Sequence, residues 1–285
     1  MARGAIAPAM TTPPPPVQDF AAVNGARLHY ELQGDGFPVV LLHGGLLDLR
    51  MWDGQVGPLS RHFTTLRYDL RGFGKTQAPV GQPYAPHEEL RALLDHFSMD
   101  RVHVIGHSLG GRFALDFALA FPERVSCLVL VAPGINGAPP SPQEHAWYMS
   151  LMGSGREKDP QAIIEAWLGS DYLAAAMARP DLAPVVRQWT LDNMASMKPG
   201  ANLPQPLEPA AHGRLEQLLM PTLVIVGDKD NPVMLKNAEE LARRVPALTR
   251  VTLPGVGHLP SLERPEDFNR AILDFLLPRS VSRSP

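Results

Sequence analysis

The sequence contains a single cysteine, Cys127, among its 285 residues. One thiol cannot form a disulfide within the chain, and it offers no cluster of thiolates to a metal ion. A reducing compartment is therefore permitted, and we expect a cytoplasmic protein without a bound metal.

The sequence also lacks a large excess of one charge and any long apolar run. Its 26 basic and 29 acidic side chains leave a net charge of −3, and no cluster of Lys and Arg suits a phosphate backbone. Apolar runs such as Val39–Leu42 and Cys127–Ala132 are far shorter than the roughly 18 residues that span a bilayer. We therefore expect a soluble protein that binds neither nucleic acid nor membrane.

Proline, by contrast, is abundant: the chain has 30, well above the usual share of about 5%. Residues 1–18 include the run Pro13–Pro16 but no apolar centre of the kind found in signal peptides. We expect a disordered, proline-rich leader there. Residues 279–285 are polar and end in proline, which predicts a flexible tail.

A β-hairpin is predicted directly after the leader. Phe20–Val23 and Arg27–Leu32 alternate with the two-residue period of strands, and they flank Asn24-Gly25, a dipeptide favoured in tight turns.

Strands and helices are predicted to alternate along the rest of the chain. Short apolar runs without alternation predict strands buried on both faces of a parallel sheet. These runs are Pro38–Leu42, Phe63–Tyr68, Val102–Ile105, Cys127–Val131, Thr222–Val226 and Thr249–Leu253. Helical spacing occurs between them in Pro86–Phe97, Gly110–Phe121, Met234–Arg244 and Pro265–Leu277. The pattern predicts an α/β fold with helices on both faces of the sheet.

The long interval between Pro133 and Thr222 contains no convincing strand. It predicts a helical cap over 135–205, inserted into a core made of 19–134 and 206–278. The expected cap helices are Gln143–Leu151, Pro160–Leu168, Asp171–Ala178 and Leu182–Met197. The cap also carries Trp147, Trp167 and Trp189. These side chains either pack the cap onto the core or line an apolar substrate pocket, and we predict a substrate-binding role for them.

The sharpest local motif is Gly106-His107-Ser108-Leu109-Gly110, a Gly-x-Ser-x-Gly pattern. It lies between a predicted strand and a predicted helix, which is the context that this motif requires. Two glycines suit a turn so tight that the strand and helix leave no room for a Cβ atom. The motif predicts an exposed, nucleophilic hydroxyl on Ser108, and a serine that merely caps the helix is the alternative.

A serine hydroxyl is a weak nucleophile near neutral pH, so it needs a base and an acid that orients the base. Asp228 and Asp230 follow the predicted strand Thr222–Val226, at the end where α/β sheets place their sites. His258 lies in a glycine-rich loop before the last helix. We predict Ser108, Asp230 and His258 as the catalytic residues, in an order known from one class of hydrolases. Asp228 could instead cap the turn, and a surface-loop histidine is the alternative for His258.

An oxyanion hole is predicted after the strand Pro38–Leu42. The glycines of His43-Gly44-Gly45-Leu46 allow the backbone to approach a substrate oxygen closely. We predict that the N–H of Gly45 or Leu46 acts together with the N–H of Leu109. His43 is expected to be a buried structural residue.

From Phe20 to about Leu277 the chain resembles α/β-hydrolases of the serine esterase and lactonase type. Besides the motifs above, the resemblance rests on Met51-Trp52, on Asp69-Leu70-Arg71-Gly72-Phe73-Gly74, and on Glu263, Pro265 and Phe268-Asn269. It implies a mostly parallel sheet of eight strands and a cap inserted after the sixth strand. It also implies hydrolysis of a small-molecule ester or lactone through an acyl-enzyme, without a metal or an organic cofactor.

Several alternative functions differ from this one in their sequence patterns. Haloalkane dehalogenases and epoxide hydrolases would carry Asp in place of Ser108. Carbon–carbon bond hydrolases keep the serine, but their pattern has Trp where Leu259 follows His258, and their substrates are anionic. The segment 135–205 has five basic and seven acidic residues, which does not favour anions. Cofactor-free perhydrolysis of the haloperoxidase type and a non-enzymatic receptor for a small molecule stay open.

A nucleotide-binding loop is disfavoured. Gly72-Phe73-Gly74-Lys75-Thr76 ends like a phosphate-binding loop, but that pattern requires glycine where this chain has Asp69.

Overall fold

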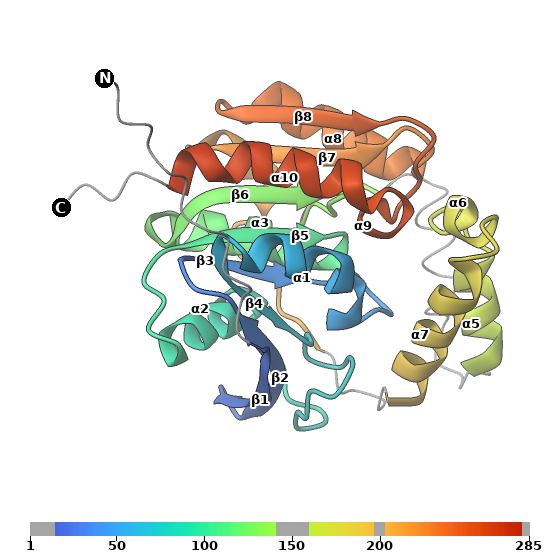
Figure 1. The fold of residues 1–285 in the computed structure, drawn as a ribbon, viewed down its shortest axis with the longest axis horizontal. Coiled ribbons are helices and arrows are strands. Elements are labelled where there is room, and N and C mark those ends of the chain that lie inside the picture. The colour runs from blue at the N-terminus through green and yellow to red at the C-terminus, as the bar shows by residue number, and fades with distance from the viewer. Residues whose placement is uncertain (1–14, 141–159, 197–202, 281–285) are drawn as a thin grey trace, which may run out of the picture.

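A sheet of eight strands forms the centre of the fold (Figure 1). The computed structural model describes residues 15–140, 160–196 and 203–280. The strands are β1 (Val17–Val23), β2 (Ala26–Gln33), β3 (Phe37–Leu42), β4 (Phe63–Tyr68), β5 (Val102–His107), β6 (Val125–Val131), β7 (Thr222–Gly227) and β8 (Leu248–Leu253). Their order across the sheet is β1-β2-β4-β3-β5-β6-β7-β8.

Most of the sheet is parallel. β1 pairs with β2 and β2 with β4 in antiparallel fashion, whereas β4, β3, β5, β6, β7 and β8 pair in parallel. The α/β fold with a mostly parallel sheet, expected from the sequence, is therefore confirmed.

Helices cover both faces of this sheet. The core helices are α1 (Asp53–Ser60), α2 (Pro86–His96), α3 (Leu109–Ala120), α8 (Pro232–Arg244), α9 (Pro260–Glu263) and α10 (Pro265–Ser280). In Figure 1, α1 and α10 lie in front of the sheet, and α2, α3 and α8 lie behind it. Three short 3-10 helices are Leu49–Trp52, Pro122–Arg124 and Ala211–Gln217.

The unalternating apolar runs are explained by burial on both faces. In β3, Val39 and Leu41 belong to the apolar cluster with α1 and α10, whereas Val40 and Leu42 belong to the cluster with α2, α3 and α8. All four side chains are fully buried. Because successive side chains of a strand point to opposite faces, a strand covered on both sides must be apolar throughout.

The hairpin and the chain ends show two small departures from the sequence expectations. Asn24 and Gly25 both have positive φ, at 45° and 79°, as the turn requires. Val17 and Gln18 already pair with β2, so the expected leader extends two residues too far. Helix α10 continues to Ser280, so the expected tail begins too early. Residues 1–14 and 281–285 lie outside the described residues.

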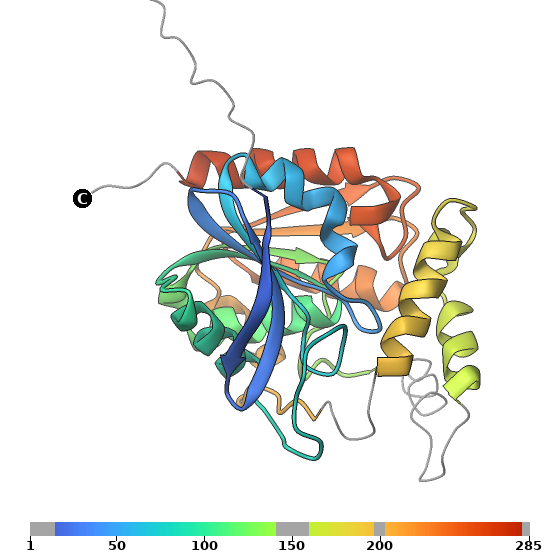
Figure 2. The ribbon, with the colours of Figure 1, turned by 60° about the horizontal axis from the view of Figure 1, so that its bottom comes forward.

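Within the expected cap, the described segment 160–196 is mostly helical. It contains α5 (Pro160–Leu168), α6 (Ala174–Met177) and α7 (Ala183–Ser196). Figures 1 and 2 place these helices together at one end of the sheet, the end to which the parallel strands point. The expected helix Gln143–Leu151 lies outside the described residues.

Apolar contacts attach these helices to the core. Ile164, Leu168, Leu173 and Val186 are buried in the same cluster as the front helices of the core. Burying such side chains stabilises the docked arrangement by roughly 1.5–3 kcal/mol each.

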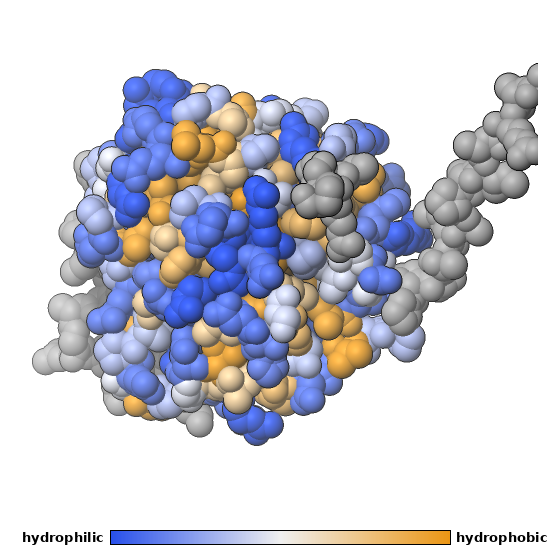
Figure 3. All heavy atoms as spheres, turned by 90° about the vertical axis from the view of Figure 1, so that its left-hand side faces the viewer, coloured by the Kyte–Doolittle hydropathy of each residue, from blue (hydrophilic) through white to orange (hydrophobic). Residues whose placement is uncertain are grey.

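The face opposite these helices has an ordinary mixed surface. Figure 3 shows hydrophilic residues there, with apolar residues in several separate groups between them. Across the described ranges, the helices are all too short or too polar to cross a bilayer.

Candidate active site

Ser108 lies in the sharp turn between β5 and α3. Its backbone has φ +50° and ψ −109°, a conformation that non-glycine residues rarely adopt. The turn is held because the Ser108 N–H donates to the carbonyl of Val131 at 2.9 Å and its own carbonyl accepts from Arg112 N–H at 2.9 Å. A half-buried serine is thereby presented at the carboxyl end of the sheet.

The two glycines of the motif are required by close backbone contacts. A Cβ atom on Gly106 would lie 2.4 Å from the carbonyl oxygen of Gly110, and one on Gly110 would lie 2.5 Å from the carbonyl oxygen of His43. The Gly110 N–H also donates to that His43 oxygen at 3.1 Å. The turn is thus built directly against the segment predicted to form the oxyanion hole.

His258 and Asp230 meet at the ends of β8 and β7. His258 Nδ1 lies 2.9 Å from Asp230 Oδ1, and both side chains are almost completely buried. A carboxylate oxygen can only accept, so Nδ1 carries the proton and Nε2 presents its lone pair. Nε2 has no hydrogen-bond partner among the described residues. The pair therefore has the arrangement of a base and its orienting acid.

The neighbouring acid Asp228 is placed differently. Its side chain is exposed, and Oδ1 accepts from the N–H of Gly255 at 2.7 Å. Asp228 thus closes the loop that precedes His258, while Asp230 contacts the imidazole.

His107 connects the serine turn with the histidine loop. Its Nε2 donates to the carbonyl of His258 at 2.7 Å, and the two ring centroids are 4.8 Å apart. Burial, followed by the nearby His258, holds the pKa of His107 well below its usual value, so the ring stays neutral. The residue next to Ser108 therefore helps to fix the position of His258.

Glu263 supports the same loop from the other side. Its carboxylate accepts from Gly257 N–H at 2.7 Å and from Leu259 N–H at 3.0 Å, on either side of His258. The sequence had identified Glu263 as part of a family motif without assigning it a contact.

The residues predicted for the oxyanion hole lie together. A Cβ atom on Gly45 would lie 3.8 Å from Leu109 Cδ2, so the two residues are neighbours. Leu109 opens α3, and the first N–H groups of a helix have no acceptor within it. Leu46 adopts a φ of +55°, which directs the backbone through a tight turn at this point.

His43 is buried with both ring nitrogens in use. Its Nε2 accepts from Leu70 N–H at 2.8 Å, so Nδ1 carries the proton and donates to the carbonyl of Gly44 at 2.7 Å. Burial lowers the pKa of His43. These contacts suit a structural role for this residue.

The helical segment 160–196 contributes an aromatic side chain that is not among the residues predicted from the sequence. Tyr172 packs against the ring of His258, with centroids 5.1 Å apart and an angle of 67°. Trp167 stacks on Tyr172 at 5.9 Å, while Trp189 lies 5.6 Å from the guanidinium of Arg50. Trp147 lies outside the described residues. No motif contains Tyr172, so only its position in the fold reveals it.

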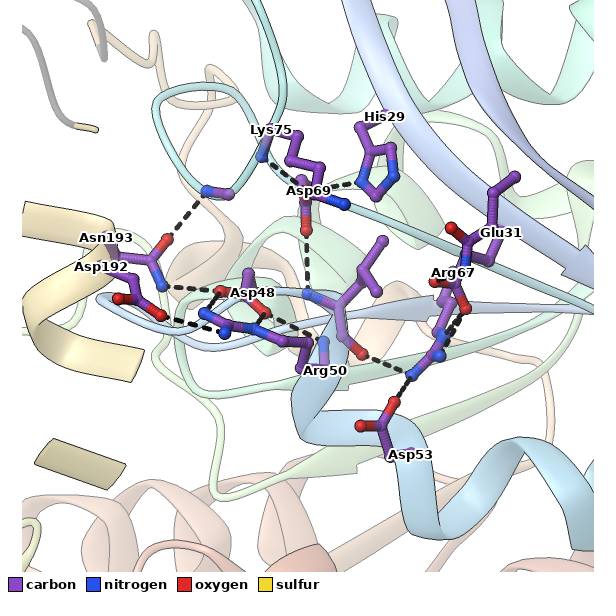
Figure 4. A pocket seen from close by; sticks show the side chains of 13 residues that line it. His29, Glu31, Asp48, Arg50, Asp53, Arg67, Asp69, Lys75, Asp192 and Asn193 are labelled. Atoms are coloured by element: carbon purple, nitrogen blue, oxygen red, sulfur yellow. Dashed lines mark hydrogen bonds and ion pairs between the residues drawn. The ribbon is translucent and has the colours of Figure 1, made fainter. Parts of the chain in front are cut away.

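A separate polar cavity of about 560 Å³ lies where α7 meets the core (Figure 4). Charged residues of both signs line it, among them Asp48, Arg50, Arg67, Asp69 and Lys75, and the three predicted catalytic residues do not. Within the described ranges, no three His, Cys, Asp or Glu side chains are grouped so as to hold a metal ion.

Comparison with known proteins identifies the family. The family model described as alpha/beta hydrolase fold matches residues 38–265. The chain belongs to the α/β-hydrolase fold family. The matched region runs from β3 to the start of α10 and thus includes the serine turn, the acid and the histidine.

Individual members of the family resemble the chain over most of its length. A 2-hydroxy-6-oxononadienedioate/2-hydroxy-6-oxononatrienedioate hydrolase of Pseudomonas putida is 30% identical, covering 88% of this chain and 91% of the relative. The carboxylesterase YbfK of Bacillus subtilis is 28% identical, covering 90% and 86%. The crystal structure of the enol-lactonase from Burkholderia xenovorans LB400 has a TM-score of 0.71 and 27% identity, covering 90% and 99%.

The close contacts of Gly110 lead to a stability prediction. Gly110→Ala places a Cβ 2.5 Å from backbone oxygen atoms, so it should lower the free energy of unfolding by about 1–3 kcal/mol. Gly213→Ala is the control, because a Cβ there meets nothing within 4 Å; it should be neutral or stabilising by about 0.4–1 kcal/mol. Denaturant unfolding of both variants measures the difference, and equal stabilities would contradict the steric account.

Proposed function

We propose that the protein hydrolyses carboxylic esters or lactones, with Ser108 as nucleophile, His258 as base and Asp230 as orienting acid. The observation that carries this proposal is the buried 2.9 Å bond from His258 Nδ1 to Asp230 Oδ1. It leaves Nε2 available in a loop that His107, the residue before Ser108, contacts, and Ser108 itself is held in a strained turn.

The proposed reaction has two stages, acylation of Ser108 and hydrolysis of the acyl-enzyme. His258 Nε2 takes the proton of Ser108 as Oγ attacks the substrate carbonyl, and Asp230 stabilises the imidazolium. The N–H groups of Leu109 and of Gly45 or Leu46 bind the negative oxygen of the tetrahedral intermediate. When the intermediate collapses, His258 returns the proton to the leaving alcohol. Water, activated by the same histidine, then releases the acid and regenerates Ser108.

The relatives support ester and lactone substrates in general terms. A carboxylesterase and an enol-lactonase both resemble this chain along nearly its whole length. In this chain, Tyr172 packs on His258 and Trp167 stacks on Tyr172, and such aromatic side chains near the proposed base suit a neutral substrate.

Removing the nucleophile gives the first test of this proposal. Ser108→Ala should lower kcat on a p-nitrophenyl ester by roughly 10⁴-fold or more while the protein stays folded, because triad members act as a unit. A fluorophosphonate should label the wild type once, and peptide mapping should place the adduct on Ser108. A variant that keeps more than a tenth of the wild-type rate would exclude Ser108 as the nucleophile.

The two acids after β7 provide a matched pair. Asp230→Asn should reduce kcat by roughly 10⁴-fold, because an amide no longer selects the productive tautomer of His258. Asp228→Asn removes one charge two residues away on an exposed side chain that contacts Gly255. It should therefore keep kcat within about twofold. The opposite ranking in steady-state kinetics would assign the orienting role to Asp228.

Carbon–carbon bond hydrolysis is the second candidate, because the 30% identical relative is named for dienedioate and trienedioate substrates. Dianions need unpaired cations in the pocket. Among residues 160–196 of the described chain, both arginines are ion-paired: Arg179, between α6 and α7, with Asp181 at 2.5 Å, and Arg187 with Glu165 at 2.9 Å. This charge balance favours the neutral ester.

A substrate panel separates the two candidates. Neutral p-nitrophenyl esters and simple lactones should give a kcat/KM at least about 100-fold above that of an ester carrying two carboxylates, because burying an unpaired charge is costly. A dienedioate ring-fission product, followed by loss of its absorbance, tests the alternative reaction. Faster turnover of that compound than of every ester in the panel would establish carbon–carbon cleavage instead.

A further inference from the structure

Helix α7 of the cap is tied to the core by a fully buried amide, Asn193 (Figure 4). Its Oδ1 accepts from Gly74 N–H at 2.8 Å, and its Nδ2 donates to Asp48 Oδ2 at 2.8 Å and to the carbonyl of Trp189 at 2.9 Å. Because the donor and the acceptors lie on opposite sides of the amide, a single orientation of the side chain satisfies all three bonds.

Asp48 is the residue through which this contact reaches the core. It caps the 3-10 helix Leu49–Trp52 and accepts from Arg50 N–H at 3.0 Å, from Nε at 2.8 Å and from Nη2 at 2.7 Å. Burial would raise the pKa of Asp48, but the hydrogen bonds from Arg50 and Asn193 keep it below its ordinary value. Asp48 therefore stays ionised, with donors from the cap on one side and from Arg50 on the other.

The segment between Gly44 and Asp48 carries the predicted oxyanion donors. At its start, the Gly44 N–H contacts Met51 Sδ at 3.4 Å, and a Cβ on Gly44 would lie 2.5 Å from His107 Nδ1. At its other end stands Asp48. Between them Leu46 has a φ of +55°, and a strained backbone of this kind persists only where its surroundings hold it.

Asp69 adds a second connection between the segment around Asp48 and the loop that contains Gly74. Asp69, on the core side, accepts from Leu49 N–H at 2.9 Å and from Lys75 N–H at 2.8 Å. The loop that gives Gly74 N–H to Asn193 is thereby tied to the residue after Asp48 (Figure 4). Hydrogen bonds of the buried side chains Asn193, Asp48 and Asp69 thus connect helix α7, the loop that contains Gly74, and the segment 44–48 with the predicted oxyanion donors.

We infer that Asn193 is a positioning residue: through Asp48 it holds the N–H group of Gly45 or Leu46 where the oxyanion forms. The inference rests on the proposed function. Oxyanion donors act within 2.7–3.1 Å, so a small shift of this segment weakens binding of the transition state more than binding of the ester. Part of the cap then belongs to the catalytic machinery through its effect on the core.

The test compares Asn193→Ala with wild type on a p-nitrophenyl ester and on the matching thionoester. Sulfur is a weak hydrogen-bond acceptor, so thionoester cleavage gains little from the oxyanion hole. The variant should lose about 10- to 100-fold in kcat on the ester, with KM within about threefold. The ratio of ester to thionoester rates should fall about tenfold, because only the ester depends strongly on the oxyanion hole. General damage to the protein would slow both substrates alike and leave this ratio unchanged.

A double-mutant cycle tests the route through Asp48. If Asn193 acts by way of Asp48, Asn193→Ala should cause no further loss of kcat in the Asp48→Ala background. Independent, additive losses would overturn the inference. So would a raised KM with unchanged kcat, or an equal loss on both substrates. Asn193→Ser, which is too short to bridge Asp48 and Gly74, serves if the alanine variant does not fold, and it carries the same expectations.

Asp192 supplies the matched control. It is the adjacent residue on α7 and pairs with Arg50 at 3.0 Å, but its side chain is 41% exposed. Asp192→Asn should leave both rates within about twofold, since exposed ion pairs contribute little. A tenfold change in the ester-to-thionoester ratio with this variant would contradict a specific role for Asn193.

The failure of this inference and the failure of the proposed function are distinguishable in the wild type. If the wild type cleaves esters and is labelled at Ser108, but the Asn193 variants keep the wild-type rate ratio, the inference alone is wrong. If the wild type cleaves no ester and takes no label at Ser108, both are wrong.

Discussion

The tight turn at Ser108 is the constraint on which the rest of the site depends. Gly106 lies so close to the start of α3, and Gly110 so close to the end of β3, that neither can carry a Cβ, and Ser108 between them has a positive φ. Such strain costs free energy, and the surrounding parallel strands offset it by holding the turn from β3 and β6. The position of the hydroxyl is therefore a consequence of how the sheet packs.

Buried polar contacts then determine how the loops around Ser108 are arranged. His107 holds the carbonyl of His258, Glu263 holds the N–H groups on either side of it, and Asp230 holds its ring. Each of these groups is buried, so leaving one unpaired would cost about 1–3 kcal/mol. The histidine loop has little freedom as a result, which suits a base that must meet its partner in one geometry.

The helical segment 160–196 contacts the His258 loop and the loop after β3. Tyr172 packs on His258, and Asn193 donates to Asp48, at the end of the segment 44–48 that carries the predicted oxyanion donors. An insertion of this kind can influence which substrates enter and, in our proposal, how well the transition state is bound. Relatives named as a carboxylesterase, an enol-lactonase and a dienedioate hydrolase show that one fold accommodates several hydrolytic reactions.

Local sequence determined the strands, most of the core helices and the candidate nucleophile, acid and histidine, because apolar periodicity and glycine-bracketed turns act over a few residues. Helix α1 escaped prediction, since Gly54, Gly57 and Pro58 disfavour a helix that here depends on packing against α10. The sequence favoured Asp230 over Asp228, and in the structure Asp230 contacts His258. Tertiary structure alone decided that Tyr172 and Asn193 reach the core. Asn193 and Asp48 are 145 residues apart, and no local pattern specifies a contact that forms only when separate segments fold together.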